Sequence, residues 1–215
     1  MSDAATRLAA VQATIARAAT IAGREPSEVR LVAVSKGRSA EQIEELIAAG
    51  QRDFGENRVQ EVAAKWPALR ERFPGVQVHM VGQLQSNKAE EAVRLFDVIH
   101  SLDRTSLLTA LTKAGWSGPT YVQVNVGEEA QKGGLALAEL PAFLQAVRGS
   151  GLALEGLMAI PPADVEPSPF FALLAKLARR HDLRGLSMGM SGDYAAAVML
   201  GATVVRVGTA LFEDA

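Results

Sequence analysis

The feature that most limits the fold is a repeated pattern, in which a short apolar segment ends in small or polar residues and a helical pattern follows. It recurs eight times along the 215 residues. Strands that alternate with helices in this way form a parallel sheet, and eight of them close a barrel. The expected strands cover residues 30–35, 53–55, 77–82, 97–101, 120–126, 153–160, 185–188 and 203–207.

The pattern predicts an α/β fold, a single (β/α)8 TIM-type barrel that forms one domain over residues 1–215. A doubly wound open sheet is the alternative. Such a sheet usually has a Gly-rich GxGxxG turn after its first strand, and "SKGRSAEQ" (35–42) has none. The most proline-dense stretch, "PPADVEPSP" (161–169), lies between a strand and its helix, so we interpret it as a loop.

The first 23 residues predict an extra N-terminal helix that ends at Gly23. Apolar residues recur there near helical spacing, while Arg7 and Arg17 interrupt any apolar run. The segment is too polar for the core of a signal peptide and too short for a membrane span. A transit peptide is the alternative, and the expected location is cytoplasmic.

Composition removes several classes of function. The formal net charge is −2 and no basic block is present, so neither nucleic acid nor a membrane surface is an expected partner. The absence of cysteine excludes disulfides and thiolate catalysis. The three histidines lie far apart in the sequence and form no metal-binding motif, so no metal is expected.

A lysine stands at the end of the first expected strand. Residues 31–34, "LVAV", have no polar gap, which suits a parallel strand buried on both faces, and Ser35 and Lys36 follow. A lysine is seldom fully buried unless it is paired. Lys36 therefore lies either at a solvated rim or in a site. Ser39 and Gln42 then form a capping-box signature for the next helix.

The loops after the last two strands have the composition of an anion site. "SMGMSGD" supplies glycines, Ser191 and a helix that begins near Asp193, and "RVGTALF" supplies Gly208 and Thr209. Barrels commonly bind phosphate with the loops after strands 7 and 8. The alternative is that both loops are tight turns with helix caps.

A lysine across the barrel mouth from a phosphate site suggests pyridoxal phosphate. An amine must be neutral to form an imine, and burial and a nearby cation both favour the neutral form. Arg206 could be that cation, because it stands two residues before Gly208 and so faces the same side of the strand. Lys88 and Lys132 are rival lysines at the same barrel end, although both lie farther into loops.

The sequence resembles the pyridoxal-phosphate homeostasis proteins, which are single-domain relatives of the alanine racemase N-terminal barrel. The resemblance covers residues 31 to 212, except that Gly37-Arg38-Ser39 departs from the pattern usual after the lysine. Its motifs, in order, are "AVSKGRS", "AGQRDFGENRVQE", "VHMVGQLQSNKA", "EEAQKGGL", "EGLMAIP", "LSMGMSGDYAAAV" and "GATVVRVGTALF".

The resemblance implies that pyridoxal 5'-phosphate is held as an imine on Lys36, with Arg206 against the pyridine nitrogen. It also implies phosphate contacts from the loops after strands 7 and 8, and further residues near the cofactor. The implied binding residues are Lys36, Asn57, His79, Met158, Ser191, Arg206, Gly208 and Thr209. Asn57 could instead cap a helix, His79 could be a core histidine, and Met158 could serve packing alone.

Two functions fit this resemblance. One is a carrier in the homeostasis and delivery of the vitamin B6 cofactor, monomeric, with apo pyridoxal-phosphate enzymes as recipients. The other is a racemase-like enzyme acting on amino acids. The racemases have a second, β-rich domain that supplies a catalytic tyrosine, and here the barrel uses the whole length. Neither Tyr121 nor Tyr194 is obviously placed as a base, so we expect a carrier without strong amino-acid turnover and assign no catalytic residue. A barrel that binds another phosphorylated metabolite is a third alternative.

Overall fold

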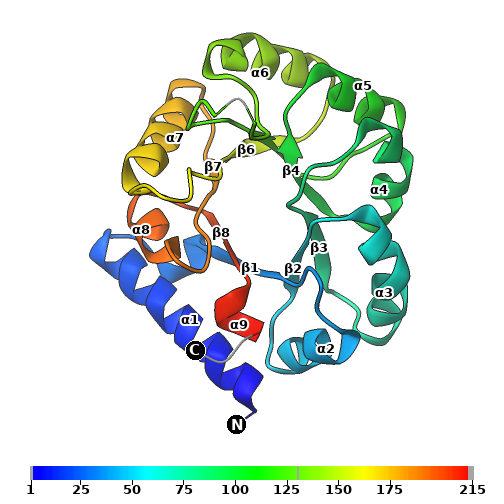
Figure 1. Ribbon diagram of the computed structural model, residues 1–215, viewed down its shortest axis with the longest axis vertical. Helices are drawn as coiled ribbons and strands as arrows, with labels where there is room; N and C mark the ends of the chain where they lie inside the picture. Colours follow the sequence, from blue (N-terminus) through cyan, green and yellow to red (C-terminus); the bar gives the residue numbers. More distant parts are fainter. Residues whose placement is uncertain (1, 130, 213–215) are drawn as a thin grey trace.

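The computed structural model describes residues 2–129 and 131–212, and these form a closed barrel of parallel strands within a ring of helices (Figure 1). Neighbouring strands follow chain order, and the last strand pairs with the first. The strands are β1 (Arg30–Val34), β2 (Asp53–Glu56), β3 (Gln77–Met80), β4 (Val98–Leu102), β5 (Thr120–Gln123), β6 (Leu154–Met158), β7 (Gly185–Ser187) and β8 (Val204–Val207).

The closing pair is β1 with β8, in which Arg30 lies opposite Val204 and Ala33 lies opposite Val207. This pairing confirms the predicted barrel and excludes the open sheet. Some strands are shorter than expected. After β5, for example, Val124 N–H still donates to the carbonyl of Met158 at 2.8 Å, but beyond it the polypeptide folds back on itself and Val124 forms an isolated bridge to Leu135.

The helices fill the connections as the apolar pattern predicts. They are α1 (Asp3–Ile21), α2 (Ala40–Ala48), α3 (Val59–Arg72), α4 (Ala89–Leu95), α5 (Thr105–Lys113), α6 (Leu140–Gly149), α7 (Ser168–Arg180), α8 (Tyr194–Met199) and α9 (Thr209–Phe212). The predicted capping box at α2 is confirmed. Gln42 N–H donates to Ser39 Oγ at 3.3 Å, and Ser39 N–H donates to Gln42 Oε1 at 3.1 Å.

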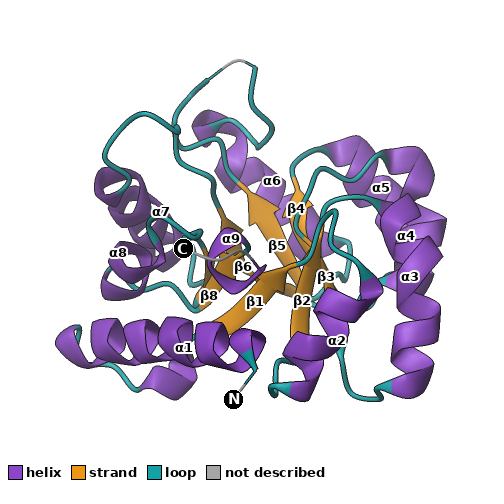
Figure 2. Ribbon diagram, turned by 60° about the horizontal axis from the view of Figure 1, so that its bottom comes forward, coloured by secondary structure: helices purple, strands orange, loops and turns teal. Residues whose placement is uncertain are grey.

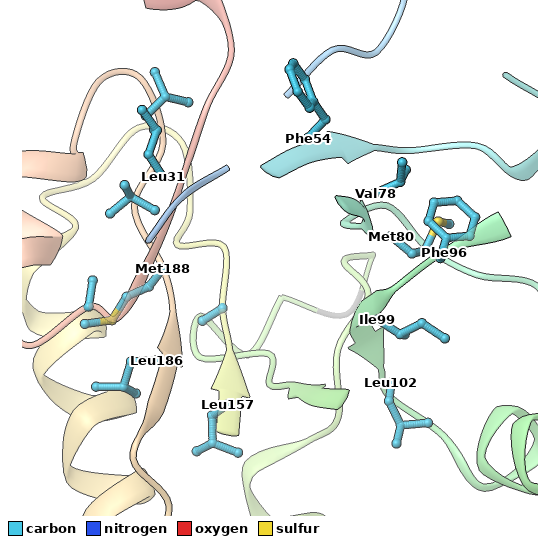
Figure 3. Packing of buried hydrophobic residues seen from close by; sticks show 14 of the residues in the cluster. Leu31, Phe54, Val78, Met80, Phe96, Ile99, Leu102, Leu157, Leu186 and Met188 are labelled. Atoms are coloured by element: carbon cyan, nitrogen blue, oxygen red, sulfur yellow. The ribbon is translucent and has the colours of Figure 1, made fainter. Parts of the chain in front are cut away.

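Strand residues alternate between two environments. One set faces the helices and packs against them, and Figure 3 shows Phe54, Ile99, Leu157 and other members pointing away from the barrel axis. The other set faces the barrel axis and includes both apolar and polar residues. Its apolar members are Val32, Val98, Tyr121, Met158 and Val204. The polar residues at the intervening inward positions therefore lie inside the barrel.

Helix α1 is the predicted N-terminal helix, and it packs along the outside of the barrel against α8 and α9 (Figures 1 and 2). Arg7 Nε donates to the carbonyl of Leu211 at 2.9 Å. Beyond the helix, Arg24 Nη1 donates to the carbonyls of Val198 and Ala202, both at 2.9 Å. These bonds tie the first helix to the last elements of the barrel. Among the described residues, no helix combines the length and apolar character needed to cross a membrane.

Candidate functional site

A cavity of about 370 Å³ opens at the carboxyl ends of the strands, the end at which Figure 2 shows the long loops. Its size suits a small ligand rather than a large one. Residues from β1 and β8 meet there with residues from the segments that follow β1, β2, β3, β6, β7 and β8. The lining residues are Val34, Lys36, Arg38, Asn57, Val81, Ile160, Met190, Ser191, Gly192, Arg206, Gly208 and Thr209.

The end of β1 is anchored by a buried carboxylate. Ser35, which directly follows β1, is fully buried, and its hydroxyl donates to Glu56 Oε1 at 2.8 Å. The same oxygen accepts from Trp66 Nε1 at 3.0 Å and pairs with Lys65 Nζ at 2.7 Å. Lys65 Nζ also donates to the carbonyl of Ser35 at 3.1 Å. These contacts fix the backbone from which the next residue, Lys36, projects.

Lys36 itself is exposed, so it lies at the rim, which was one of the two predicted positions. The reason is local, since β1 ends at Val34 and the polypeptide turns at once. Gly37 has φ of 67°, a left-handed conformation that suits glycine, and its N–H donates to Glu61 Oε2 at 3.1 Å. The turn places the Lys36 side chain at the mouth of the cavity and within its lining.

The two loops predicted to form an anion cradle contact each other. Ser191 Oγ accepts a hydrogen bond from the backbone N–H of Gly208 at 3.1 Å, so the two loops touch. Gly189 has φ of 94°, and a Cβ there would lie 2.6 Å from the Cβ of Ala197. Glycine is therefore required for the loop after β7 to pack against α8. The cradle offers a hydroxyl and backbone N–H groups, which are suitable donors to a phosphate.

Arg206 lies on β8 and forms the floor of the cavity. The residue is 4% exposed, and its guanidinium is tied down at two atoms. Nη1 donates to Ser187 Oγ at 2.6 Å, and Nη2 donates to the carbonyl of Ala159 at 2.9 Å. Burial lowers the pKa of Arg206 to about 10, and the Asp193 carboxylate opposes this shift. The side chain is still a cation at neutral pH.

The structure brings together most of the residues predicted to bind a cofactor. Six of them line the cavity, and they are Lys36, Asn57, Ser191, Arg206, Gly208 and Thr209. His79 and Met158 are not brought to it. His79 lines a separate cavity of about 270 Å³ at the opposite end of the barrel. Met158 is fully buried in the axial cluster with Val32 and Val204.

The rival lysines lie outside the cavity. Lys88 borders a neighbouring hollow and pairs with Glu91 at 3.1 Å. Lys132 pairs with Glu129 at 2.8 Å in the loop that contains Ala130, which lies outside the described residues. Among the described residues that line the cavity, Lys36 is the one lysine.

Sequence reasoning missed three residues that shape the site. Arg38 lines the cavity beside Lys36, and its guanidinium lies 5.5 Å from the centre of the Phe212 ring. Its position two residues after Lys36 in the sequence could have indicated that it lies near the site. The ion pair of the buried Glu56 with the partly buried Lys65 gave a weaker signal, because only the tertiary structure brings this residue of α3 under the end of β1.

The fold and the site define a class of protein: a (β/α)8 barrel with a lysine, a buried guanidinium and an anion cradle at one mouth. Residues 6–215 match the family model described as "Alanine racemase, N-terminal domain". The chain is 43% identical to the pyridoxal phosphate homeostasis protein of Pseudomonas aeruginosa, covering 99% of this chain and 96% of that one. It is 40% identical to the Escherichia coli K12 protein of the same name, covering 99% and 97%. The chain therefore belongs to the pyridoxal phosphate homeostasis protein family.

Solved structures agree with this assignment. PipY of Synechococcus elongatus PCC7942, solved with pyridoxal phosphate bound, aligns with a TM-score of 0.82 at 39% identity, over 98% of this chain and all of that one. Alanine racemase of Corynebacterium glutamicum aligns with a TM-score of 0.67 at 17% identity, over 95% of this chain and 60% of that one. The second likeness is one of fold alone.

Proposed function

We propose that this protein binds pyridoxal 5'-phosphate at the mouth of the barrel and takes part in the homeostasis and delivery of the vitamin B6 cofactor. The cofactor is held as an imine on Lys36. The observation that carries the proposal is that one cavity contains Lys36, the cation of Arg206 and the cradle around Ser191 and Gly208. The relatives named for pyridoxal phosphate homeostasis and the PipY structure support it.

The residues present fit this cofactor group by group. The phosphate matches the donors of Ser191, Gly208 and Thr209. The pyridine nitrogen matches Arg206, whose guanidinium can only donate hydrogen bonds. The aldehyde matches the amine of Lys36. The cavity volume of about 370 Å³ is sufficient for a single ring with two short substituents.

The same geometry favours a carrier over a racemase-like enzyme. When bound, the cofactor supplies an electron-withdrawing ring that acidifies the α-carbon of an attached amino acid. Racemisation needs a base on each face of that carbon. Neither of the two tyrosines lies among the described residues that line the cavity. Tyr121 stacks on His100 with ring centroids 4.6 Å apart, inside the barrel.

The first experiment tests the site of attachment. The purified protein is loaded with pyridoxal phosphate, treated with borohydride and mapped by peptide mass. The cofactor mass is expected on the peptide that contains Lys36. Lys88→Ala and Lys132→Ala are matched controls that should retain the visible absorbance, whereas Lys36→Ala should lose it. Finding the label mainly on Lys88 or Lys132 overturns the assignment.

The second experiment separates the carrier from the enzyme. The loaded protein is incubated with both hands of common amino acids in deuterated water, and α-proton exchange is followed. Exchange at an enzyme's rate that Lys36→Ala abolishes contradicts the carrier. Transfer of the cofactor to an apo pyridoxal-phosphate enzyme without such exchange supports the carrier.

A further inference from the structure

A continuous row of hydrogen-bonded side chains crosses the interior of the barrel from the floor of the cofactor cavity to the opposite end. Arg206 Nη1 lies 2.6 Å from Ser187 Oγ, which lies 2.8 Å from His100 Nδ1. His100 Nε2 lies 3.0 Å from His79 Nδ1, and His79 Nε2 lies 3.1 Å from Asp53 Oδ1. We call these five residues the axial network.

The axial network is unusual for such an interior. Layers of branched apolar side chains ordinarily fill a TIM-type barrel. Here Ser187 and His100 are fully buried, and His79 is 1% exposed. A buried polar network costs stability unless its groups are satisfied. No side-chain nitrogen or oxygen of the network is among the described buried atoms that lack a partner.

The far end of the network sets the direction of its protons. A carboxylate oxygen can only accept, so the bond to Asp53 places a proton on His79 Nε2, and a ring with that single proton leaves Nδ1 bare. His100 must then donate from Nε2 and accept at Nδ1. The Ser187 hydroxyl consequently donates to His100, and its oxygen accepts from Arg206.

The surroundings of His100 favour its neutral ring. Burial holds the pKa of His100 well below its ordinary value, and the charge of Arg206 acts in the same direction. At the exposed end of the network, Arg30 Nη1 lies 3.6 Å from Asp53 Oδ1. Glu28 and Glu155 also border the cavity at that end. The opposite direction of the network would require a proton on both nitrogens of His79.

We propose that the axial network holds the Arg206 guanidinium in the orientation in which it faces the ring nitrogen of the cofactor, and that Ser187, His100, His79 and Asp53 are positioning residues. The inference rests on the proposed function for the identity of the ligand. Without Ser187, one of the two bonds that fix the guanidinium would be missing, leaving the one to the Ala159 carbonyl. The more distant residues act by keeping the Ser187 hydroxyl turned toward His100.

The first test needs no ligand. Nitrogen-15 NMR of the histidine rings in the cofactor-free protein reports which ring nitrogen carries the proton. His79 and His100 should both be neutral with the proton on Nε2. His181, which lies outside the network, assists assignment through a His181→Gln variant. A proton on Nδ1 of either axial histidine contradicts the proposed direction.

The second test compares two ligands, pyridoxal phosphate and its analogue with the ring nitrogen replaced by C–H. The measured quantity is the ratio of their affinities. The affinity for pyridoxal phosphate should fall in each of Ser187→Ala, His100→Phe and Asp53→Ala. The loss should be about tenfold for Ser187→Ala, because this variant removes a hydrogen bond from a charged donor. The affinity for the analogue should be nearly unchanged in these variants, and also in the reference variant Arg206→Gln. Asp53→Asn keeps an acceptor for His79 and should restore the wild-type ratio.

Matched controls separate positioning from stability. Thr120→Val removes a buried hydrogen bond from Trp116 Nε1, 2.8 Å long, outside the network. Arg30→Gln removes the ion pair of Asp53 but leaves its bond to His79. Neither control should change the affinity ratio. Network variants that fold and weaken both ligands equally, or neither, overturn the inference. A wild-type protein that binds neither ligand contradicts the proposed function instead, and the NMR measurement still decides the direction of the network.

Discussion

Ser191 Oγ accepts a hydrogen bond from the backbone N–H of Gly208 at 3.1 Å, which joins the two loops of the anion cradle. The bond keeps both groups close together at the cavity before a phosphate arrives. A bound phosphate would accept from the Gly208 N–H, and the Ser191 hydroxyl would then turn from acceptor to donor. The cradle therefore needs little rearrangement to bind an anion.

Ser191→Ala is expected to lower the affinity for pyridoxal phosphate by about tenfold, because the lost hydrogen bond to a charged group contributes roughly 1.5–3 kcal/mol. The same variant should bind pyridoxal, which lacks the phosphate, as tightly as the wild type does. Affinities from titration of the visible absorbance check this. Thr209→Val should have a smaller effect, since an exposed threonine can also act through its backbone N–H. Equal loss for both ligands in Ser191→Ala would place the phosphate elsewhere.

Lys65→Met should destabilise the protein by about 3–5 kcal/mol, because it leaves the fully buried Glu56 carboxylate without its cation. The double variant Lys65→Met with Glu56→Gln removes both charges and should recover part of this loss. Urea unfolding measures the free energy of both variants. A single variant as stable as the wild type would show that the ion pair does not anchor the end of β1.

The stability of the protein should fall as the pH drops below roughly 6.5. His100 stays neutral in the folded state because its pKa is well below the ordinary value, whereas the unfolded state takes up a proton near that value. A depressed folded pKa means that the unfolded state binds more protons, so stability rises with pH in this window, by at most about 1.4 kcal/mol per pH unit.

Urea unfolding near pH 7 and near pH ~5.5 measures this slope. His100→Phe should reduce it, whereas His181→Gln, at the end of α7, should leave more of it intact. An unchanged slope in His100→Phe would assign the acid sensitivity to other groups.

Gly189→Ala should destabilise the protein by more than about 1 kcal/mol, because φ of 94° is unfavourable for any other residue. Its Cβ would also lie 2.6 Å from the Cβ of Ala197. Adding Ala197→Gly relieves the collision but not the backbone strain, so the double variant should recover only part of the loss in thermal unfolding. Full recovery would show that the collision alone requires glycine.

Much of the fold was predictable because its signals are local. The capping box of Ser39 and Gln42 needs only neighbours in sequence, and the inward position of Arg206 follows from its spacing of two to Gly208. The axial network could not be predicted in this way. The contact of His79 with His100 depends on the register between β3 and β4 and on the radius of the closed barrel. Neither the register nor the radius produces a recognisable residue pattern within one strand.

The choice between the two predicted positions of Lys36, the rim and a site, could not be made from the sequence for a related reason. The sequence shows that an apolar strand precedes the lysine, but not at which residue the strand stops pairing. Glu56 and Lys65, which lie on other elements, hold Ser35 at the end of β1. The rim of the site is thus set by tertiary contacts, whereas its floor is set by strand periodicity.

The pairing of β1 with β8 also means that the site joins the first strand to be synthesised with the last. Lys36 leaves the ribosome early, whereas Arg206 and Gly208 emerge only after nearly all of the barrel. A nascent or truncated polypeptide that stops before β8 has the amine but neither the cation nor the cradle. Retention of the cofactor would therefore distinguish finished barrels from incomplete ones.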